Sequence, residues 1–245
     1  LHYGDKYDDL TYNDILVRAC ANAGILAFTG DGTDPKVVEG AAEALKANSG
    51  CGVPTIKPWD MDTIREKFAL VQEAEPFAIA MDIDAAGLPF LQGLTPPAGS
   101  KSVEELKQIV SWAQRPFILK GIMTARGAEK ALEAGASGIV VSNHGGRVLD
   151  HCPATAEVLP EIVDAVGKDV MVLVDGGIRT GMDVFKALAL GAKGVLIARP
   201  FVNMVYGGGL EGPAVLVEKL KAELEDTMLM CGAHSLAEID RSMVR

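Results

Sequence analysis

The chain has 245 residues, of which 49% are hydrophobic, and it carries a formal net charge of −10. Its length suffices for one large domain or two small ones, and we expect a single domain over residues 1–245. The negative charge argues against a nucleic-acid groove and a polybasic membrane patch, because both depend on clustered cations near phosphate. Small molecules are therefore the expected partners.

Short apolar runs alternate with helical stretches along the whole chain. The first helix is expected at residues 12–23, and seven apolar runs predict strands at residues 24–29, 53–58, 77–82, 117–121, 138–142, 171–175 and 195–198. Strands that are apolar throughout are typical of a parallel sheet buried on both faces. Amphipathic segments predict further helices at residues 103–112, 125–134, 156–166, 182–190 and 216–230.

The repeated βα pattern predicts a (β/α)8 TIM barrel that lacks its first strand in this chain. Eight strands close such a barrel and only seven are expected here, so residues 12–23 would be the helix that follows the missing strand. The chain also starts without methionine, and we expect the domain to be N-terminally incomplete. An open barrel exposes two strand edges. The long loop at residues 88–101 is expected to be either a lid or a plain connector.

The four cysteines and the lengths of the apolar runs bear on the cellular location. The cysteines are widely spaced and form no Cys-x-x-Cys pair, so we expect reduced thiols, with neither a metal site nor disulfides. No apolar run approaches the ~20 residues that span a bilayer, and the first residues do not resemble a signal sequence. A cytoplasmic protein without membrane contact is expected.

A histidine and an arginine follow the expected strand at residues 138–142. The stretch reads Ser142-Asn143-His144-Gly145-Gly146-Arg147. The carboxyl ends of barrel strands are where such folds keep their chemistry. The His144 imidazole exchanges protons near neutral pH, and the planar guanidinium of Arg147 matches a carboxylate. The pair predicts proton abstraction beside a bound carboxylate.

Two charged residues end neighbouring strands. Lys120 closes the strand at residues 117–121, and its ammonium group is expected to stabilise a developing anion at the open face. Asp82 ends the preceding strand, where its carboxylate would orient His144 and stabilise the protonated imidazole. Asp84 lies two residues further on, points to the same face and competes with Asp82 for that role.

Two later strand ends carry glycines and arginines. The first reads Asp175-Gly176-Gly177-Ile178-Arg179, and its paired glycines let backbone amides approach a ligand closely. The second, Ala198-Arg199-Pro200, follows the last expected strand. With a first strand missing, these would be the ends of strands seven and eight, which commonly form a phosphate site in α/β barrels.

Taken together, these motifs resemble the FMN-dependent α-hydroxy acid oxidase and dehydrogenase family, which includes glycolate oxidase and lactate oxidase. The resemblance extends over nearly the whole chain from about Leu10 on. Its most specific parts are Lys120-Gly121, residues 142–150, residues 175–192 and Arg199-Pro200. It implies a flavoenzyme that uses FMN to oxidise a small L-2-hydroxy acid such as lactate or glycolate to the 2-oxo acid. The resemblance also implies assembly, because members of this family form oligomeric barrels, so a homo-oligomer is expected.

The resemblance implies a role for each matching residue. His144 would be the base, Arg147 would hold the substrate carboxylate, Asp82 would pair with His144, and Lys120 would stabilise the reduced flavin. The other implied flavin contacts are Thr29, Thr55, Ser142, Asp175, Gly176, Gly177, Arg179, Ala198 and Arg199. Ala198 replaces a glycine that is usual in the family, with its backbone amide retained.

Two departures from the family pattern affect the expected substrate. Lys57 stands where the family has a substrate-binding tyrosine, so a cation replaces a hydroxyl donor and is itself expected to bind substrate. A second substrate arginine, expected soon after Asp82, is absent from residues 83–89. Two alternatives therefore remain. One is another FMN-barrel reaction, like that of type 2 isopentenyl diphosphate isomerase, and the other is a truncated barrel without activity.

Overall fold

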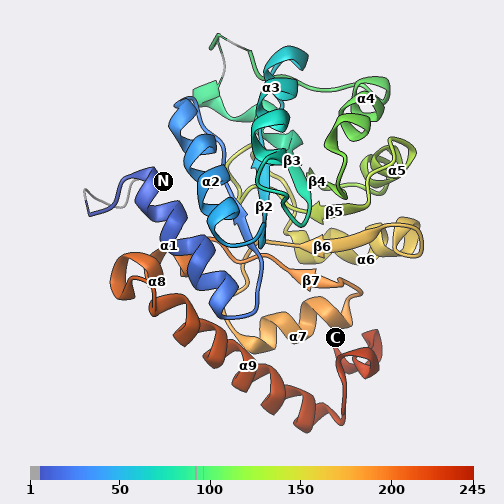
Figure 1. Ribbon diagram of the computed structural model, residues 1–245. Coiled ribbons are helices and arrows are strands. Elements are labelled where there is room, and N and C mark those ends of the chain that lie inside the picture. The colour runs from blue at the N-terminus through green and yellow to red at the C-terminus, as the bar shows by residue number, and fades with distance from the viewer. Residues whose placement is uncertain (1–5, 92, 96) are drawn as a thin grey trace.

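Strands and helices alternate along a computed structural model that describes residues 6–91, 93–95 and 97–245 (Figure 1). The strands are β1 (Ala27–Thr29), β2 (Gly52–Ile56), β3 (Ile79–Asp82), β4 (Phe117–Ile122), β5 (Gly138–Val141), β6 (Met171–Val174) and β7 (Gly194–Val195). The helices are α1 (Asp9–Asn22), α2 (Pro35–Ala47), α3 (Met61–Gln72), α4 (Val103–Ala113), α5 (Ala125–Glu133), α6 (Thr155–Val166), α7 (Gly181–Ala189), α8 (Arg199–Gly208) and α9 (Gly212–Cys231). The first five residues, for which no signal sequence is expected, lie outside the described residues.

Within the described residues, seven parallel strands form one sheet in the order β1-β2-β3-β4-β5-β6-β7. The predicted strands and the predicted alternation of strands with helices are confirmed. The fold is that of a (β/α)8 barrel with one strand fewer, and the described sheet is open between β1 and β7. Because these edge strands have three and two residues, they present few unpaired backbone groups.

The ends of the two edge strands differ from the predicted bounds. Gly24 has φ +72° and terminates the turn after α1, so β1 starts only at Ala27. At the other edge the chain enters α8 at Arg199, which leaves β7 with two residues. Glycine takes the left-handed conformation without a steric penalty, whereas a side chain there is strained.

Apolar side chains pack in layers on both faces of the sheet. Outside it, residues of β2 to β6 pack against α3 to α7 in the largest core cluster. Inside the curved sheet a small cluster is built from Val53, Ala78, Ala80, Ile118 and Val140. A third cluster joins α1, α8 and α9 through Leu16, Phe201 and Leu216. Figure 1 shows these helices on the open side of the barrel, where they bury apolar surface next to the sheet edges.

The connection after β3 is a braced loop. It forms two short 3-10 helices, η1 (Ile83–Gly87) and η2 (Pro89–Leu91), and it buries Leu88 and Leu91 in the core. The Lys101 ammonium group donates to the carbonyl oxygen of Pro58 at 3.1 Å, and Gly99 N donates to the same oxygen at 2.9 Å. These bonds favour the connector reading of the loop over the lid reading. Residues 92 and 96 of this loop lie outside the described part of the chain.

Among the described residues, no helix is both long enough and apolar enough to cross a membrane. All four cysteines are free thiols. Burial raises the pKa of the Cys20 thiol to about 12, which keeps this side chain protonated and unreactive at neutral pH.

Candidate active site

Parallel pairing brings four polar residues to one end of the sheet. Asp82 at the end of β3 pairs in register with Lys120 of β4, while Ser142 and Asp175 follow β5 and β6 directly. Because all strands run the same way, their carboxyl ends share one edge. The structure thus gathers residues that lie as far apart in the chain as 82 and 175.

Lysines and aspartates alternate at the centre of this edge. Lys120 Nζ lies 3.0 Å from Asp82 Oδ1 and 3.8 Å from Asp175 Oδ2. Lys57 Nζ lies 4.0 Å from Asp82 Oδ2, and its side chain is only 8% exposed. Each buried charge thus has an opposite charge within reach, which such groups require in a low-dielectric interior.

The pKa values of these residues shift in directions that follow from burial and pairing. Burial opposes ionisation of Asp82, but Lys120 and Lys57 outweigh it and hold the pKa of this carboxyl below its usual value. Burial also lowers the pKa of Lys120, yet the aspartates around it, Asp82 first, raise it above its usual value overall. Burial raises the pKa of Asp175, and Lys120 offsets this only in part. A permanently charged lysine therefore stands at the strand ends.

The loop after β5 holds His144 in a defined position. His144 has φ +56°, and its backbone N donates to the Ser142 hydroxyl at 3.1 Å. The Asn143 side chain accepts a bond from Gly146 N at 3.1 Å and donates one to Pro153 O at 3.2 Å. These bonds brace the loop on both sides of His144, whose side chain is only 13% exposed.

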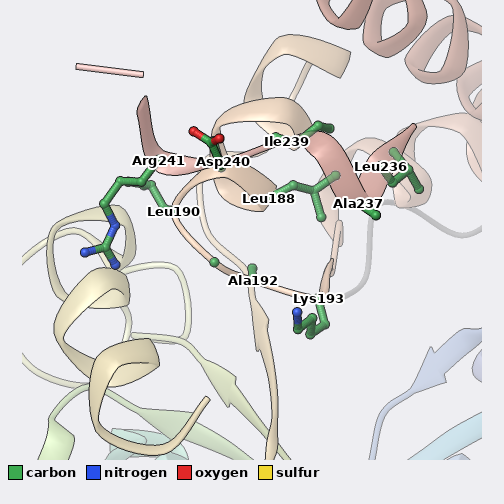
Figure 2. Close-up of a pocket in the computed structure, with 11 residues that line it drawn as sticks. Leu188, Leu190, Ala192, Lys193, Leu236, Ala237, Ile239, Asp240 and Arg241 are labelled. Carbon is green, nitrogen blue, oxygen red and sulfur yellow. The ribbon is translucent and has the colours of Figure 1, made fainter. Parts of the chain in front are cut away.

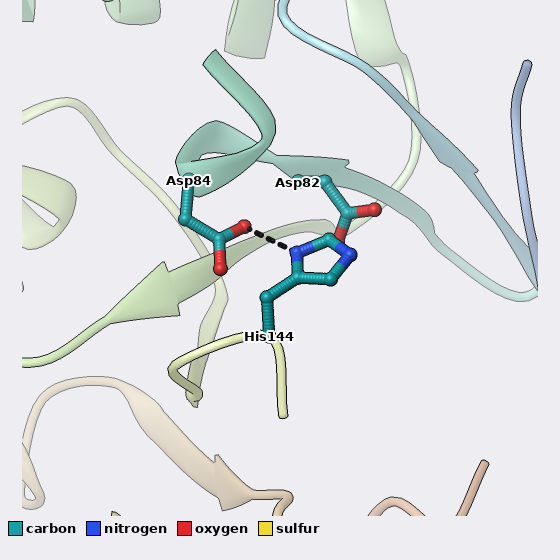
Figure 3. A group of neighbouring side chains, drawn as sticks. All are labelled: Asp82, Asp84 and His144. Atoms are coloured by element: carbon teal, nitrogen blue, oxygen red, sulfur yellow. Dashed lines mark hydrogen bonds and ion pairs between the residues drawn. The ribbon is translucent and has the colours of Figure 1, made fainter. Parts of the chain in front are cut away.

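The imidazole of His144 bonds to Asp84 (Figure 3). Its Nδ1 lies 3.0 Å from Asp84 Oδ1. An ionised carboxylate only accepts hydrogen bonds, so a bond to ionised Asp84 requires the tautomer of His144 that carries its proton on Nδ1. In that tautomer the lone pair of Nε2 is free. The pairing of His144 with Asp82 that the resemblance implies is thus not the one found. Asp82 lies nearby, but its carboxylate faces Lys120 and Lys57.

Asp82, Asp84 and His144 each offer a potential metal ligand, and these atoms lie within 4.8 Å of one another. The two lysines beside Asp82 already supply positive charge at this point. A further cation would be repelled by both ammonium groups, so the arrangement favours ion pairs over a metal centre.

Asp31, which sequence reasoning missed, fixes the end of β2. Its fully buried carboxylate accepts bonds from Lys57 N at 3.0 Å, from Trp59 Nε1 at 2.6 Å and from Lys67 Nζ at 2.5 Å. The carboxylate therefore holds the backbone that carries Lys57. Its position directly after the first expected strand is the one signal that could have found it, since polar residues at strand ends serve barrel active sites.

Thr29 and Thr55 lie buried in β1 and β2, next to the same edge of the sheet. Thr29 Oγ1 is buried without a hydrogen-bond partner among the described residues. The same holds for Asp175 Oδ1, close to Lys120. Buried polar atoms are nearly always paired, so these two are candidates for bonds to a bound molecule.

The predicted phosphate residues follow the adjacent strands β6 and β7 and are exposed. Gly176 and Gly177 are exposed and have φ +95° and +80°. The guanidinium groups of Arg147, Arg179 and Arg199 are exposed, and no described residue forms a hydrogen bond or an ion pair with them. Arg199 begins α8, and its Nη2 lies 3.3 Å from where a Cβ on Gly145 would stand. Ala198, the N-cap of α8, is also exposed, so the first amides of this helix are accessible to an anion.

A cavity of about 470 Å³ lies elsewhere (Figure 2). It is lined by residues 188–193, which lead into β7, and by residues of the C-terminal turns, among them Leu236, Ile239 and Arg241. Because residues 188–193 precede β7, this cavity lies toward the amino-terminal ends of the strands. It is therefore separate from the carboxyl-end residues described above.

Comparisons with known proteins agree on one family. The sequence profile of FMN-dependent dehydrogenase matches residues 90–245. The peroxisomal (S)-2-hydroxy-acid oxidase GLO4 of Oryza sativa subsp. japonica is 50% identical over 151 residues, which cover 62% of this chain and 40% of that protein. L-lactate oxidase of Roseobacter sp. (strain GAI101) is 45% identical over 138 residues, which cover 56% of this chain and 37% of that protein. The chain thus matches about 40% of the length of these curated relatives.

Solved structures agree over a larger part of the chain. A mandelate oxidase variant with a monooxide FMN adduct superposes with a TM-score of 0.80 at 32% identity, covering 94% of this chain and 72% of that one. Lactate oxidase from Pediococcus acidilactici gives a TM-score of 0.82 at 30% identity, covering 94% of this chain and 69% of that one.

Proposed function

The chain belongs to the FMN-dependent dehydrogenase family, and from that premise we propose that it oxidises a small L-2-hydroxy acid to the 2-oxo acid. The observation that carries the proposal is His144, which Asp84 holds through Nδ1 so that Nε2 can serve as a base. Three residues later comes Arg147, whose guanidinium group has no hydrogen-bond or ion-pair partner among the described residues. A base next to a carboxylate ligand is what oxidation at the carbon beside a carboxylate requires. The proposed unit is one FMN-binding domain over residues 1–245.

The residues at the strand ends fit FMN. Thr29 and Asp175 keep buried oxygens that lack a partner in the described chain, Gly176 and Gly177 expose backbone amides, and Arg179 and Arg199 have unpaired guanidinium groups. We assign the phosphate to Arg179, Arg199 and the amides near Ala198, and the ribityl chain to Asp175. The ring system would contact Ser142, Thr29, Thr55 and Lys120. The ribityl chain, the phosphate and the ring system of FMN thus each have suitable partners among these residues.

The mechanism follows from the positions of the protein side chains. Arg147 binds the substrate carboxylate and presents the hydroxyl-bearing carbon to His144. The oxidation removes two electrons and two protons, one proton from the hydroxyl group and one from Cα. His144 accepts one of these protons at Nε2, and the two electrons leave with the other proton to the electron acceptor. Asp84 stabilises the imidazolium that forms. FMN, when bound, supplies the two-electron acceptor, and Lys120 places a positive charge for the anion that reduction creates.

The surroundings of Lys57 support a role for this residue in substrate binding. Its ammonium group is buried and its one described ion pair, with Asp82, is long at 4.0 Å. Asp82 lies closer to Lys120, at 3.0 Å, so Lys57 is the less neutralised of the two cations. We assign Lys57 as a second group that attracts the anionic substrate.

Two further properties belong to the proposal. A homo-oligomer is supported by three exposed apolar side chains of α9, Val215, Leu229 and Met230. Sedimentation at the monomer mass would contradict it. A cytoplasmic location is supported by the four free thiols. Fractionation of the source cells tests the location, and recovery in another compartment would contradict it.

Two single variants test the assigned roles. His144→Ala is expected to bind FMN with nearly unchanged affinity but to abolish flavin reduction by substrate, because His144 transfers a proton and does not hold phosphate. Arg199→Ala is expected to weaken FMN binding first, by about 10-fold or more, since a charge-assisted bond is worth roughly 1.5–3 kcal/mol. FMN titrations monitored by fluorescence, followed by anaerobic mixing with lactate, measure both effects. Equal loss of binding in the two variants would refute the assignment.

A further inference from the structure

We propose that Asp84 is the positioning residue of His144, while Asp82 serves the two lysines and does not orient the base. The catalytic consequence rests on the proposed function, whereas the structural part stands on the geometry alone. The residue pattern left Asp82 and Asp84 as competitors, and three observations decide between them.

The first observation is the hydrogen bond itself. Asp84 Oδ1 lies 3.0 Å from His144 Nδ1, and the two side chains are only 9% and 13% exposed. Among the described residues, Asp84 forms no other ion pair, and its Oδ2 has no hydrogen-bond partner. A 3.0 Å bond between two largely buried side chains, with no second partner for Asp84 among the described residues, fixes the orientation of the ring.

The second observation is that Asp82 is occupied. Both its oxygens face ammonium groups, Oδ1 that of Lys120 at 3.0 Å and Oδ2 that of Lys57 at 4.0 Å. Turning this carboxylate toward His144 would leave Lys57 without its counter-charge and Lys120 with only its longer contact to Asp175, at 3.8 Å. Loss of a counter-charge is costly in a low-dielectric site. Asp82 therefore acts on His144 only through space.

The third observation is that the backbone makes room for Asp84. The register of β4 and β5 shifts between Lys120 and Ile122, with Gly121 at φ +100° in the bulge. A Cβ on Gly121 would stand 2.5 Å from Asp84 Cβ and 2.7 Å from Asp84 Oδ1. Bulges commonly re-aim side chains next to active sites. Here the bulge lets the carboxylate of Asp84 lie against the backbone of β4.

Asp84 therefore sets the tautomer of His144. A proton held on Nδ1 leaves the lone pair of Nε2 free to accept a proton from substrate. The negative charge of Asp84 then stabilises the imidazolium. Asp84 lies in the segment after β3 where the family resemblance predicts a second substrate arginine. In this chain the segment therefore orients His144 and does not bind the substrate carboxylate.

The tautomer can be observed directly by NMR. We would record imidazole 15N–1H correlation spectra of the full chain with FMN at a pH where His144 is neutral, with His144→Ala to assign its signals among the four histidines. In the unaltered protein the proton is expected on Nδ1. Asp84→Ala should shift the population toward the Nε2–H form, and the matched Asp82→Ala should leave it on Nδ1. A shift in Asp82→Ala with none in Asp84→Ala would overturn the proposal.

A kinetic arm uses Asp84→Asn, which keeps the volume of the side chain if the alanine variant does not fold. The rate of flavin reduction at saturating substrate is expected to fall by about 100-fold or more, within the range ascribed to acid–base groups, with substrate affinity little changed. Loss of affinity at an unchanged rate would contradict a positioning role. If the unaltered protein is not reduced by any 2-hydroxy acid, the proposed function fails, while the NMR arm still decides the role of Asp84.

Discussion

Buried charges of the site are compensated locally, and this has consequences for stability. Lys120 lies between Asp82 and Asp175, yet the pKa values of the two carboxyls shift in opposite directions. Two lysines face Asp82 and stabilise its ionised form, whereas burial dominates at Asp175 and disfavours its charge. The ionisation of these two carboxyls should therefore change the stability of the fold in opposite directions, although both face Lys120.

We expect the two carboxyls to change the pH dependence of stability with opposite signs. The folded-state pKa of Asp82 is lowered, so its contribution is present above the usual value near 3.8 and is lost as pH falls through the folded pKa. The folded-state pKa of Asp175 is raised, so its ionisation costs stability that is recovered as pH falls toward 3.8. Each unit of displacement is worth about 1.4 kcal/mol.

Urea unfolding of Asp82→Asn, Asp175→Asn and the unaltered protein between pH 7 and 3 measures this. The unfolding free energy of the unaltered protein should exceed that of Asp82→Asn at neutral pH, and this difference should shrink below pH 4. The unaltered protein should be less stable than Asp175→Asn at neutral pH, and this difference should shrink as pH falls. Difference curves of the same sign would contradict the assignment.

Lys57 offers a test of substrate recognition. Lys57→Met keeps the length of the side chain but removes its charge, so KM for a 2-hydroxy acid should rise about 10- to 100-fold while FMN affinity stays within a few-fold. Lys46→Met, on the exposed face of α2, is the control. Steady-state kinetics provide the readout, and an unchanged KM would remove Lys57 from the substrate site.

The polar residues at strand ends were largely predictable, but their partners were not. Asp82, Lys120, His144 and Asp175 stand directly at or after apolar runs, which is visible in the sequence. The bond from His144 to Asp84 depends on the bulge at Gly121, and the role of Asp31 depends on where β2 and α3 meet in space. No local pattern encodes either contact.

Gly121 lies against Asp84, the partner of His144, so a side chain there should be costly. Gly121→Ala is expected to strain a residue at φ +100° and to clash with Asp84, lowering the unfolding free energy by more than the ~1 kcal/mol that strain alone costs. Gly24→Ala, at φ +72° with no atom within 4 Å of the added Cβ, should lose only the strain part. Denaturant unfolding compares the two variants, and equal losses would show that Asp84 does not crowd Gly121.

Asp31 ties three elements together, and its charge should matter for stability. Asp31→Asn removes the ion pair with Lys67 and leaves a buried ammonium group, so we expect a loss of about 3 kcal/mol. The control Asp14→Asn breaks an exposed pair with Arg18 and should cost less than about 1 kcal/mol. Thermal unfolding of both variants is the measurement, and similar small losses would mean that the Asp31 cluster does not hold β2.

Across the whole molecule, the strands and their order follow from the sequence because each run is mainly apolar and helical segments separate most of the runs. The covering of the open side was not predictable. Tyr7 and Tyr206, which lie 199 residues apart, pack edge to face with ring centroids 5.3 Å apart, and α1 contacts both α8 and α9. Such contacts arise because the curved sheet brings the two ends of the chain together, and they leave no periodic signal in either segment.

The proposed oxidation is tested first by the anaerobic visible spectrum of the unaltered protein mixed with FMN, before and after addition of L-lactate, glycolate or D-lactate. We expect bound flavin whose absorbance band is bleached by L-lactate or glycolate and not by D-lactate. Bound flavin that no 2-hydroxy acid bleaches would contradict the proposed reaction, and failure to bind FMN would contradict the assignment of the strand-end residues.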